Sequence, residues 1–189
     1  RELQLKVPMM ALVVDYPTLI NSEYVNYADN LKNCYLSFDT SKGDNVLYSK
    51  TVFGVKDSME CRMVEGSELC YEDIDCGKSS RVFYSEACEN CHNICFSKNM
   101  MGCSNCFGCI NLTNKNYYIL NQPYSKEEYE KKLKEFRLDT FSGVESARKE
   151  VEKFWLQYPV KFAHARHNFN SSGDYLFRSK NAQRMYQVR

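Results

Sequence analysis

Residues 79–114 read SSRVFYSEACEN, CHNICFSKNMMG and CSNCFGCINLTN, three consecutive segments of twelve residues that share one pattern. The pattern extends without insertion or deletion over eight such segments, from Leu19 to Asn114. A fixed period is typical of a solenoid, in which each repeat packs only on its neighbours. The sequence therefore predicts a mainly β protein built on a narrow β-solenoid of 12-residue repeats.

Positions 1, 4, 7 and 10 of the repeat carry small or aliphatic side chains. These 32 residues include no aromatic residue, one charge (Asp73) and nine of the ten cysteines, although aromatics make up 14% of the chain. We infer that these positions face an interior too narrow for a ring, where cysteine serves as a small buried side chain. Asp73 is then expected to be a hydrogen-bonded structural residue rather than a local opening of the coil.

Two further columns indicate how the chain turns and stacks. Position 12 is rich in Gly and Asn, which tolerate positive φ, so it predicts a turn. Position 3 is Asn or Asp in six of the eight repeats, which predicts a ladder of side-chain hydrogen bonds along the solenoid. We expect one repeat per coil, because an inward residue at every third position suits a tight coil. A 24-residue coil that holds two repeats is the alternative.

The pattern changes after Tyr124 and indicates two helices. Ser125 followed by Glu128 is a capping-box signature, which predicts a helix over residues 126–136. A second helix is expected over residues 142–157, where apolar residues recur at helical spacing. Together the two predict a helical hairpin that is inserted after the solenoid.

The basic tail, residues 161–189, shows the three-residue spacing again and predicts a second solenoid stretch. Its six basic residues and one acidic residue give +5, whereas residues 19–124 carry 9 basic and 13 acidic residues, a net of −4. Nucleic acid is therefore not expected at the solenoid, and a nucleic-acid- or ribosome-associated accessory role of the tail is one alternative. No apolar run approaches the ~20 residues that span a membrane. The expected parts are an N-terminal segment or cap (1–18), the solenoid (19–124), the hairpin (125–160) and the tail (161–189).

The cysteine motifs fit the repeat as well as they fit metal binding. CENCHNIC over residues 88–95 has zinc-like spacing, and CSNCFGC over residues 103–109 resembles the start of an iron–sulfur sequence. The three-residue spacing is also the inward period, and other repeats carry Ser or Val in the same columns. Packing is therefore preferred, no cofactor is expected, and a zinc or thiol-redox module remains the alternative. The candidate zinc ligands are Cys88, Cys91, His92 and Cys95.

The cysteines also bear on the redox state of the thiols and on the cellular location of the protein. Several pairs, such as Cys70 with Cys76, are placed where disulfides are conceivable, but Ser in equivalent positions argues that none is required. Since the sequence contains no signal peptide, free thiols and a cytoplasmic protein are expected.

Four motifs, at residues 32–35, 67–72, 105–109 and 121–129, are similar to those of one protein family. The chain resembles, from about Pro8 to Tyr175, an uncharacterised family of Cys-, Asn- and Tyr-rich repeat proteins from candidate-phylum bacteria. Fuller members carry a Cys-x-x-Cys zinc-ribbon-like segment ahead of the repeats. This sequence shows no such segment, so zinc or nucleic-acid binding by it is not carried over. The resemblance implies no established activity.

The outward positions carry the functional prediction. No catalytic constellation stands out, so no enzymatic activity is predicted, whereas positions 5 and 6 form an apolar and aromatic stripe along the solenoid. A stripe of this kind marks an interface, unless the hairpin, the N-terminal segment or the tail covers it. The leading hypothesis is a non-enzymatic repeat scaffold that binds a protein partner or a second copy of itself. The predicted interaction face consists of Tyr35, Leu47, Met59, Tyr71, Phe83 and Phe107.

Overall fold

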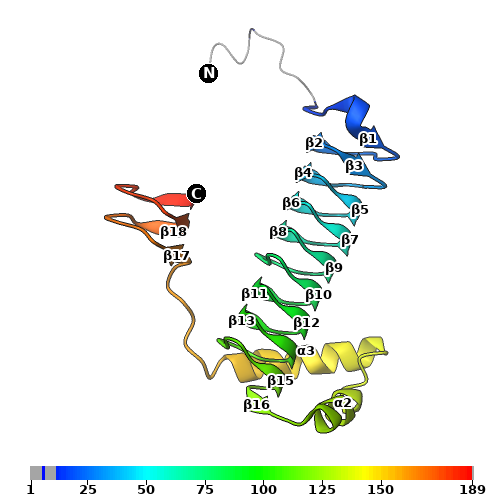
Figure 1. Ribbon diagram of the computed structural model, residues 1–189, viewed down its shortest axis with the longest axis vertical. Helices are drawn as coiled ribbons and strands as arrows, with labels where there is room; N and C mark the ends of the chain where they lie inside the picture. Colours follow the sequence, from blue (N-terminus) through cyan, green and yellow to red (C-terminus); the bar gives the residue numbers. More distant parts are fainter. Residues whose placement is uncertain (1–5, 7–11, 189) are drawn as a thin grey trace. The chain divides into compact units, whose positions relative to one another are not determined.

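The structure, a computed structural model, describes Lys6 and residues 12–188 (Figure 1). The chain divides into two compact units, Arg1–Trp155 and Leu156–Arg189. The first unit contains the solenoid and the helical hairpin, and the second contains a short additional solenoid stretch. Of the predicted N-terminal segment, all but Lys6 and residues 12–18 lies outside the described residues.

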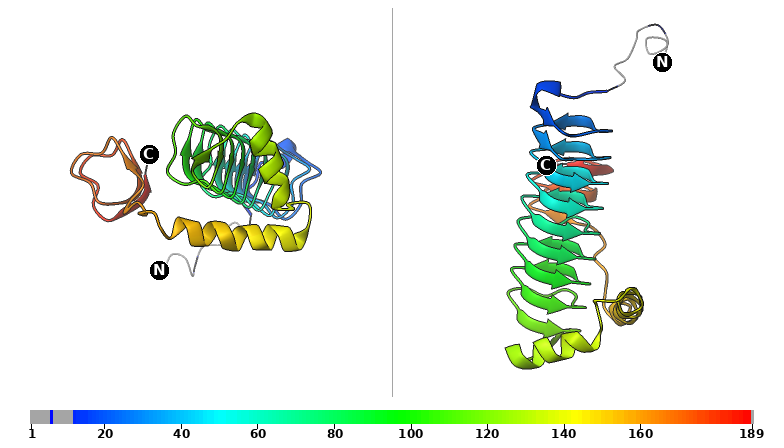
Figure 2. Two further views of the ribbon diagram at one scale, coloured as in Figure 1. Left: turned by 90° about the horizontal axis from the view of Figure 1, so that it is seen from below. Right: turned by 90° about the vertical axis from the view of Figure 1, so that its right-hand side faces the viewer.

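Each coil of the solenoid contains twelve residues. Neighbouring coils pair in parallel, and partners stand twelve apart, as in Leu19 with Leu31 and Ile94 with Cys106. The predicted β-solenoid is thus confirmed, and the alternative of a 24-residue coil is wrong. Figures 1 and 2 show the coils of the first unit stacked into a rod with sheets on two sides.

The strands of the first unit form three sheets. The ten-stranded sheet runs along one side and consists of β1 (Leu19–Ile20), β3 (Leu31–Lys32), β5 (Asp44–Leu47), β7 (Lys56–Met59), β9 (Glu68–Tyr71), β10 (Ser80–Phe83), β12 (His92–Cys95), β14 (Ser104–Phe107), β15 (Asn116–Ile119) and β16 (Gln122–Pro123). The other side holds β2 (Asn26–Asp29), β4 (Phe38–Ser41), β6 (Lys50–Phe53) and β8 (Arg62–Glu65), then β11 (Glu86–Glu89) and β13 (Lys98–Met101). Between β8 and β11 the register continues through single bridges at Ile74 and Gly77.

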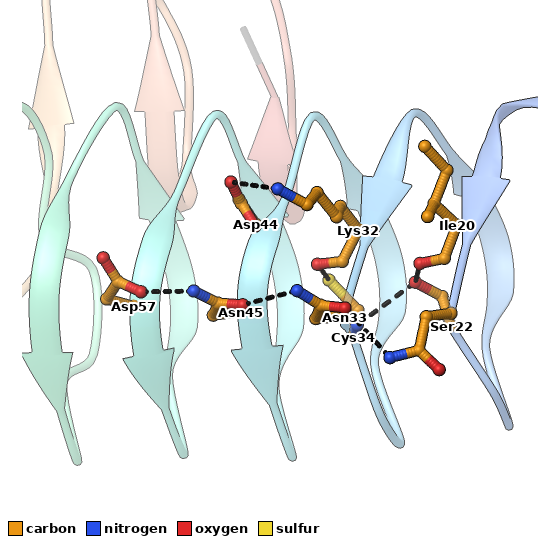
Figure 3. A network of polar contacts seen from close by, with 9 residues as sticks. Ile20, Ser22, Lys32, Asn33, Cys34, Asp44, Asn45 and Asp57 are labelled. Atoms are coloured by element: carbon orange, nitrogen blue, oxygen red, sulfur yellow. Dashed lines mark hydrogen bonds and ion pairs between the residues drawn. The ribbon is translucent and has the colours of Figure 1, made fainter.

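The interior consists of the predicted columns. Every residue at positions 1, 4, 7 and 10 from Val25 to Cys109 is buried. Cysteine and serine do more there than fill space. The Cys34 thiol donates to the Lys32 carbonyl at 3.4 Å, while the Cys34 N–H donates to Ser22 Oγ at 3.1 Å (Figure 3). All nine inward cysteines donate in this way to the carbonyl two residues earlier. Cysteine and serine side chains thus form hydrogen bonds with backbone N–H and carbonyl groups of the coils. Valine in the same columns cannot form these bonds.

The coil turns at four corners, where the sequence predicted one. All residues at positions 3, 6, 9 and 12 of the eight repeats have positive φ, including large ones such as Leu36 and Tyr48. A left-handed non-glycine residue costs on the order of 1 kcal/mol or more. Hydrogen bonds between coils offset this cost, as in the Tyr48 N–H that donates to the Tyr35 carbonyl at 2.9 Å. Turning after every third residue is what points each third side chain inward.

The predicted asparagine ladder is present at position 3. The side-chain amide of Asn21 donates to Asn33 at 2.9 Å, Asn33 to Asn45 at 3.0 Å, and Asn45 to Asp57 at 2.6 Å (Figure 3). Asn tolerates the positive φ of this corner, and its side chain also forms a hydrogen bond with the equivalent residue of the next coil. One residue type thus stabilises both the turn and the stacking.

Asp73 lies inside the solenoid in the position-7 column. It is fully buried, and its Oδ1 accepts the N–H of Ser85 at 3.0 Å. Ser49 and Ser97 make the equivalent bond with Oγ, to the N–H of the residue twelve positions later. Asp73 therefore is the hydrogen-bonded structural residue that the sequence predicts. Burial raises the pKa of its carboxyl group to about 7.

The hairpin follows the last strand. Helix α2 (Lys126–Glu135) begins at Ser125, whose hydroxyl accepts the Glu128 N–H at 3.2 Å, so the predicted capping box is confirmed. Helix α3 (Phe141–Trp155) follows after a short turn and buries Ala147 and Val151. Strand β16 pairs antiparallel with β15 and closes that end of the sheet.

The second unit is a short solenoid stretch, as the tail spacing predicts. Its strands β17 (Ala165–Arg166), β18 (Gly173–Phe177) and β19 (Met185–Val188) pair in parallel. Partners stand eleven residues apart between β17 and β18, and twelve apart between β18 and β19. Leu176 is buried, and the His164 ring stacks on Tyr175 with centroids 4.6 Å apart.

Candidate interaction face

The aromatic stripe consists of repeat positions 5 and 6 and lies along one edge of the ten-stranded sheet. Position 5 is the last residue of strands such as β5, β9 and β10, and position 6 is the positive-φ corner that follows. Both side chains point away from the interior, because the inward residues occupy positions 4 and 7. The period of the coil thus places these residues in rows along the rod.

Rings in neighbouring coils contact one another along the stripe. Tyr24 and Tyr35 pack edge to face at 5.4 Å between centroids, and Tyr35 and Tyr48 do so at 5.8 Å. Further along, Tyr84 stacks on Phe96 at 4.6 Å. Such contacts are worth roughly 0.5–1.5 kcal/mol each beyond area burial and hold the rings in fixed orientations. The stripe is therefore a preorganised surface.

The hairpin covers the end of the stripe nearest to it. Phe96 and Phe107 are 2% and 0% exposed, and the ring centroids of Phe107 and Phe136 lie 4.3 Å apart. The prediction that Phe107 belongs to an open interaction face is therefore wrong. Tertiary packing of α2 and α3 makes it a core residue of the first unit.

Helix α3 is fixed to the stripe by one glycine and one arginine. A Cβ on Gly108 would lie only 3.0 Å from Val151 Cγ2, so the absence of a side chain there permits the close approach. Arg148 pairs with Glu72 at 2.9 Å and lies over the Tyr84 ring, 5.1 Å from its centroid. The ion pair and the cation–π contact hold the helix at this edge.

The remaining half of the stripe is uncovered by the residues of the first unit that the structure describes. Tyr24 is 68% exposed, Tyr48 51%, Tyr35 37% and Phe83 36%. A shallow hollow of about 230 Å³ opens next to the covered half. Its apolar walls are formed by Leu47, Met59, Leu69, Tyr71 and Phe83. Five of the six predicted face residues thus line or flank an open apolar surface.

Sequence reasoning missed three contributors to this surface. Leu69 sits in the otherwise polar position-3 column, and this break in the column is a signal that could have identified it. Glu60 and Glu72 occupy position 6, where four of the eight repeats carry a ring. The pairing of Glu72 with Arg148 joins residues 76 apart in the chain, and no local pattern predicts it.

The candidate zinc ligands do not converge. Cys88 and Cys91 are buried inside the coil, whereas His92 is exposed on the sheet, where its Nδ1 lies 2.7 Å from Ser80 Oγ. Cys95 lies at position 5 beside the residues that pack on the hairpin. Only every third residue of the coil faces inward, so Cys88 and Cys91 point into the coil while His92 and Cys95 point out of it, and the linear spacing is not a spatial cluster. Within the part of the chain that the structure describes, no three His, Cys, Asp or Glu side chains gather as a metal-binding group.

Several of the thiols are poor nucleophiles in this environment, whereas hydrogen bonds with the Cys88 and Cys106 thiols lower the pKa of Cys91 and Cys109. All ten cysteines are free. Burial, with the Asp73 carboxylate nearby, raises the pKa of Cys61 to about 12, and burial likewise raises that of Cys95 to about 12. A thiol with such a pKa contributes almost no thiolate near neutral pH. Sulfur in this interior acts as a hydrogen-bonding packing group.

No protein-family model matches the chain, and no curated protein matches it. Among the described residues, neither helix combines the length and apolar character needed to cross a bilayer.

Proposed function

We propose that the chain is a non-enzymatic repeat scaffold that binds protein through the uncovered half of its aromatic stripe. The observation that carries the proposal is the contrast along one stripe. Phe96 and Phe107 are buried by the hairpin, while equivalent positions in earlier coils, such as Tyr35 and Tyr48, remain exposed. An exposed apolar surface of this kind, which continues a part of the stripe that is buried by the hairpin, is typical of a binding site.

The composition of the exposed half supports this function. Tyrosine is enriched in the energetic centres of protein interfaces, and rings held by their neighbours lose little conformational entropy on binding. The contacts of Tyr35 with Tyr24 and Tyr48 provide this restraint. Charged groups at the margin, including Asp57 and Glu60, would form the polar rim.

The thiol-redox alternative has less support. Nine cysteines are buried with their S–H groups bonded to backbone carbonyls, and the raised pKa of Cys61 disfavours a thiolate. The alternative of nucleic-acid binding by the basic tail rests on charge alone.

Photo-crosslinking in an extract of the source cells tests the proposal. A benzophenone amino acid is placed at Tyr48 in the stripe or, as a matched control, at Phe53, which is 43% exposed on the opposite sheet. We expect protein adducts from position 48 and not from position 53. Adducts with the chain itself would identify a second copy as the partner.

A surface variant completes the test. Replacing Tyr35 and Phe83 with serine should abolish the adducts from position 48 while lowering the melting temperature only modestly, because both side chains are partly exposed and Tyr35 loses only its ring contacts with Tyr24 and Tyr48. Equal adducts from positions 48 and 53, or adducts that persist in the double variant, would refute binding through this stripe.

A further inference from the structure

We propose that the partner docks an amphipathic α-helix carrying a basic residue, which lies beside α3 over the hollow formed by Met59, Tyr71 and Phe83. This inference rests on the proposed function and names the chemistry of the partner. It follows from how the chain covers the other half of the same stripe.

The molecule shows which structural element fits this surface. Where the stripe is covered, α3 lies transverse to the rod and roughly parallel to the coils (Figures 1 and 2), and it buries Ala147 and Val151, which are 2% and 0% exposed. The position-5 column, which the hairpin covers at Phe107, continues into the hollow, where it is occupied by Met59, Tyr71 and Phe83. A second helix with small and aliphatic residues on one face would meet the same row of side chains.

The spacing of the coils suits two helices side by side. Tyr71 stands two coils before Cys95, which packs against the hairpin cluster. At ~4.8 Å per coil this separation is ~9.6 Å, and packed helices lie roughly 8–10 Å apart. A helix centred on Tyr71 would therefore contact both the hollow and the flank of α3.

Charge specifies the partner further. Glu72 already pairs with Arg148 of α3 at 2.9 Å. Glu60 occupies the same repeat position in the preceding coil, one coil further from α3, and its side chain is exposed. No basic residue occupies position 6 of any repeat. An Arg or Lys on the docking helix would meet Glu60 as Arg148 meets Glu72, with a Tyr ring nearby.

A stapled helical peptide of residues 141–157 serves as the probe, because α3 is a helix known to fit the stripe. The peptide is fluorescently labelled, and its binding to the full chain is measured by anisotropy. We expect saturable binding that Met59→Glu or Phe83→Glu weakens at least tenfold. Phe53→Glu on the opposite sheet is the control and should leave the affinity unchanged.

Charge reversal locates the helix. Glu60→Lys should weaken binding by up to about 5-fold, and a peptide with Arg148→Glu should regain the loss on that variant. Sensitivity to Glu72→Lys instead of Glu60→Lys would mean that the peptide displaces α3, and that result would overturn the inference. The inference would also be overturned if the peptide did not bind, or if Met59→Glu and Phe83→Glu left its affinity unchanged. If crosslinks form at position 48 but the peptide does not bind, the proposed scaffold function is supported and the docking of a helix is refuted.

Discussion

Replacement of the buried carboxyl group in the solenoid interior should stabilise the protein. In the Asp73→Ser variant, the new hydroxyl takes the place that Ser49 and Ser97 hold in other coils, where Oγ accepts the next N–H at 3.1 Å. The hydrogen bond to Ser85 would be kept, and the buried charge removed. We expect a higher free energy of unfolding at and above neutral pH.

The magnitude follows from the carboxyl pKa. Burial raises it from 3.8 to about 7, so the folded state holds the proton more tightly than the unfolded chain does. Stability is therefore lost as pH rises from about 4 to about 7, and ~1.4 kcal/mol per pKa unit gives a total of ~4 kcal/mol. Between about pH 5 and pH 8, the advantage of the serine variant should grow by roughly 3 kcal/mol.

Urea unfolding of both proteins, followed by circular dichroism at several pH values in reductant, measures this difference directly. Other titrating groups are common to both proteins, so the difference isolates Asp73. The isosteric Asp73→Asn variant should show the same loss of pH dependence. A difference that stays constant between pH 5 and 8, or a less stable serine variant at pH 8, would show that the carboxyl group does not carry this burial penalty.

Three further predictions concern the hairpin and the thiols. Phe107→Ala should cost about 3–5 kcal/mol of stability because it empties a buried site, whereas Tyr35→Ala should cost far less; equal losses in urea unfolding would contradict the assigned burial. Ser125→Ala should cost about 1 kcal/mol through loss of the capping box, and thermal melts with no change would argue against it. Inward thiols such as Cys61 should resist alkylation at pH 8 until urea is added, and mass spectrometry that finds rapid native modification would contradict their raised pKa.

Much of the local architecture was predictable because it repeats. The position-3 asparagines and the inward columns recur every twelve residues, so each repeat tests the same local rule. The helix that begins after Ser125 was predictable from its capping box alone. Even so, periodicity did not reveal that cysteine at these positions is a hydrogen-bond donor, nor that every third residue adopts positive φ.

The candidate site was predictable only in part. The rings of the stripe were identified from their column, but Phe107 proved to be a core residue. The candidate zinc ligands are separated because the three-residue period of the coil places Cys91 inward and His92 outward. Arg148 and Glu72 meet across 76 residues of sequence, a distance at which no local pattern operates.

The sequence by itself determined the coil, its inward and outward faces and the presence of an aromatic stripe, because these depend on a short period that each repeat enforces. Only the tertiary structure decided which half of the stripe is a surface. That choice depends on where the hairpin docks, which the Val151 contact at Gly108 and the Arg148–Glu72 ion pair fix. The same kind of ring is therefore core at Phe107 and exposed at Tyr48.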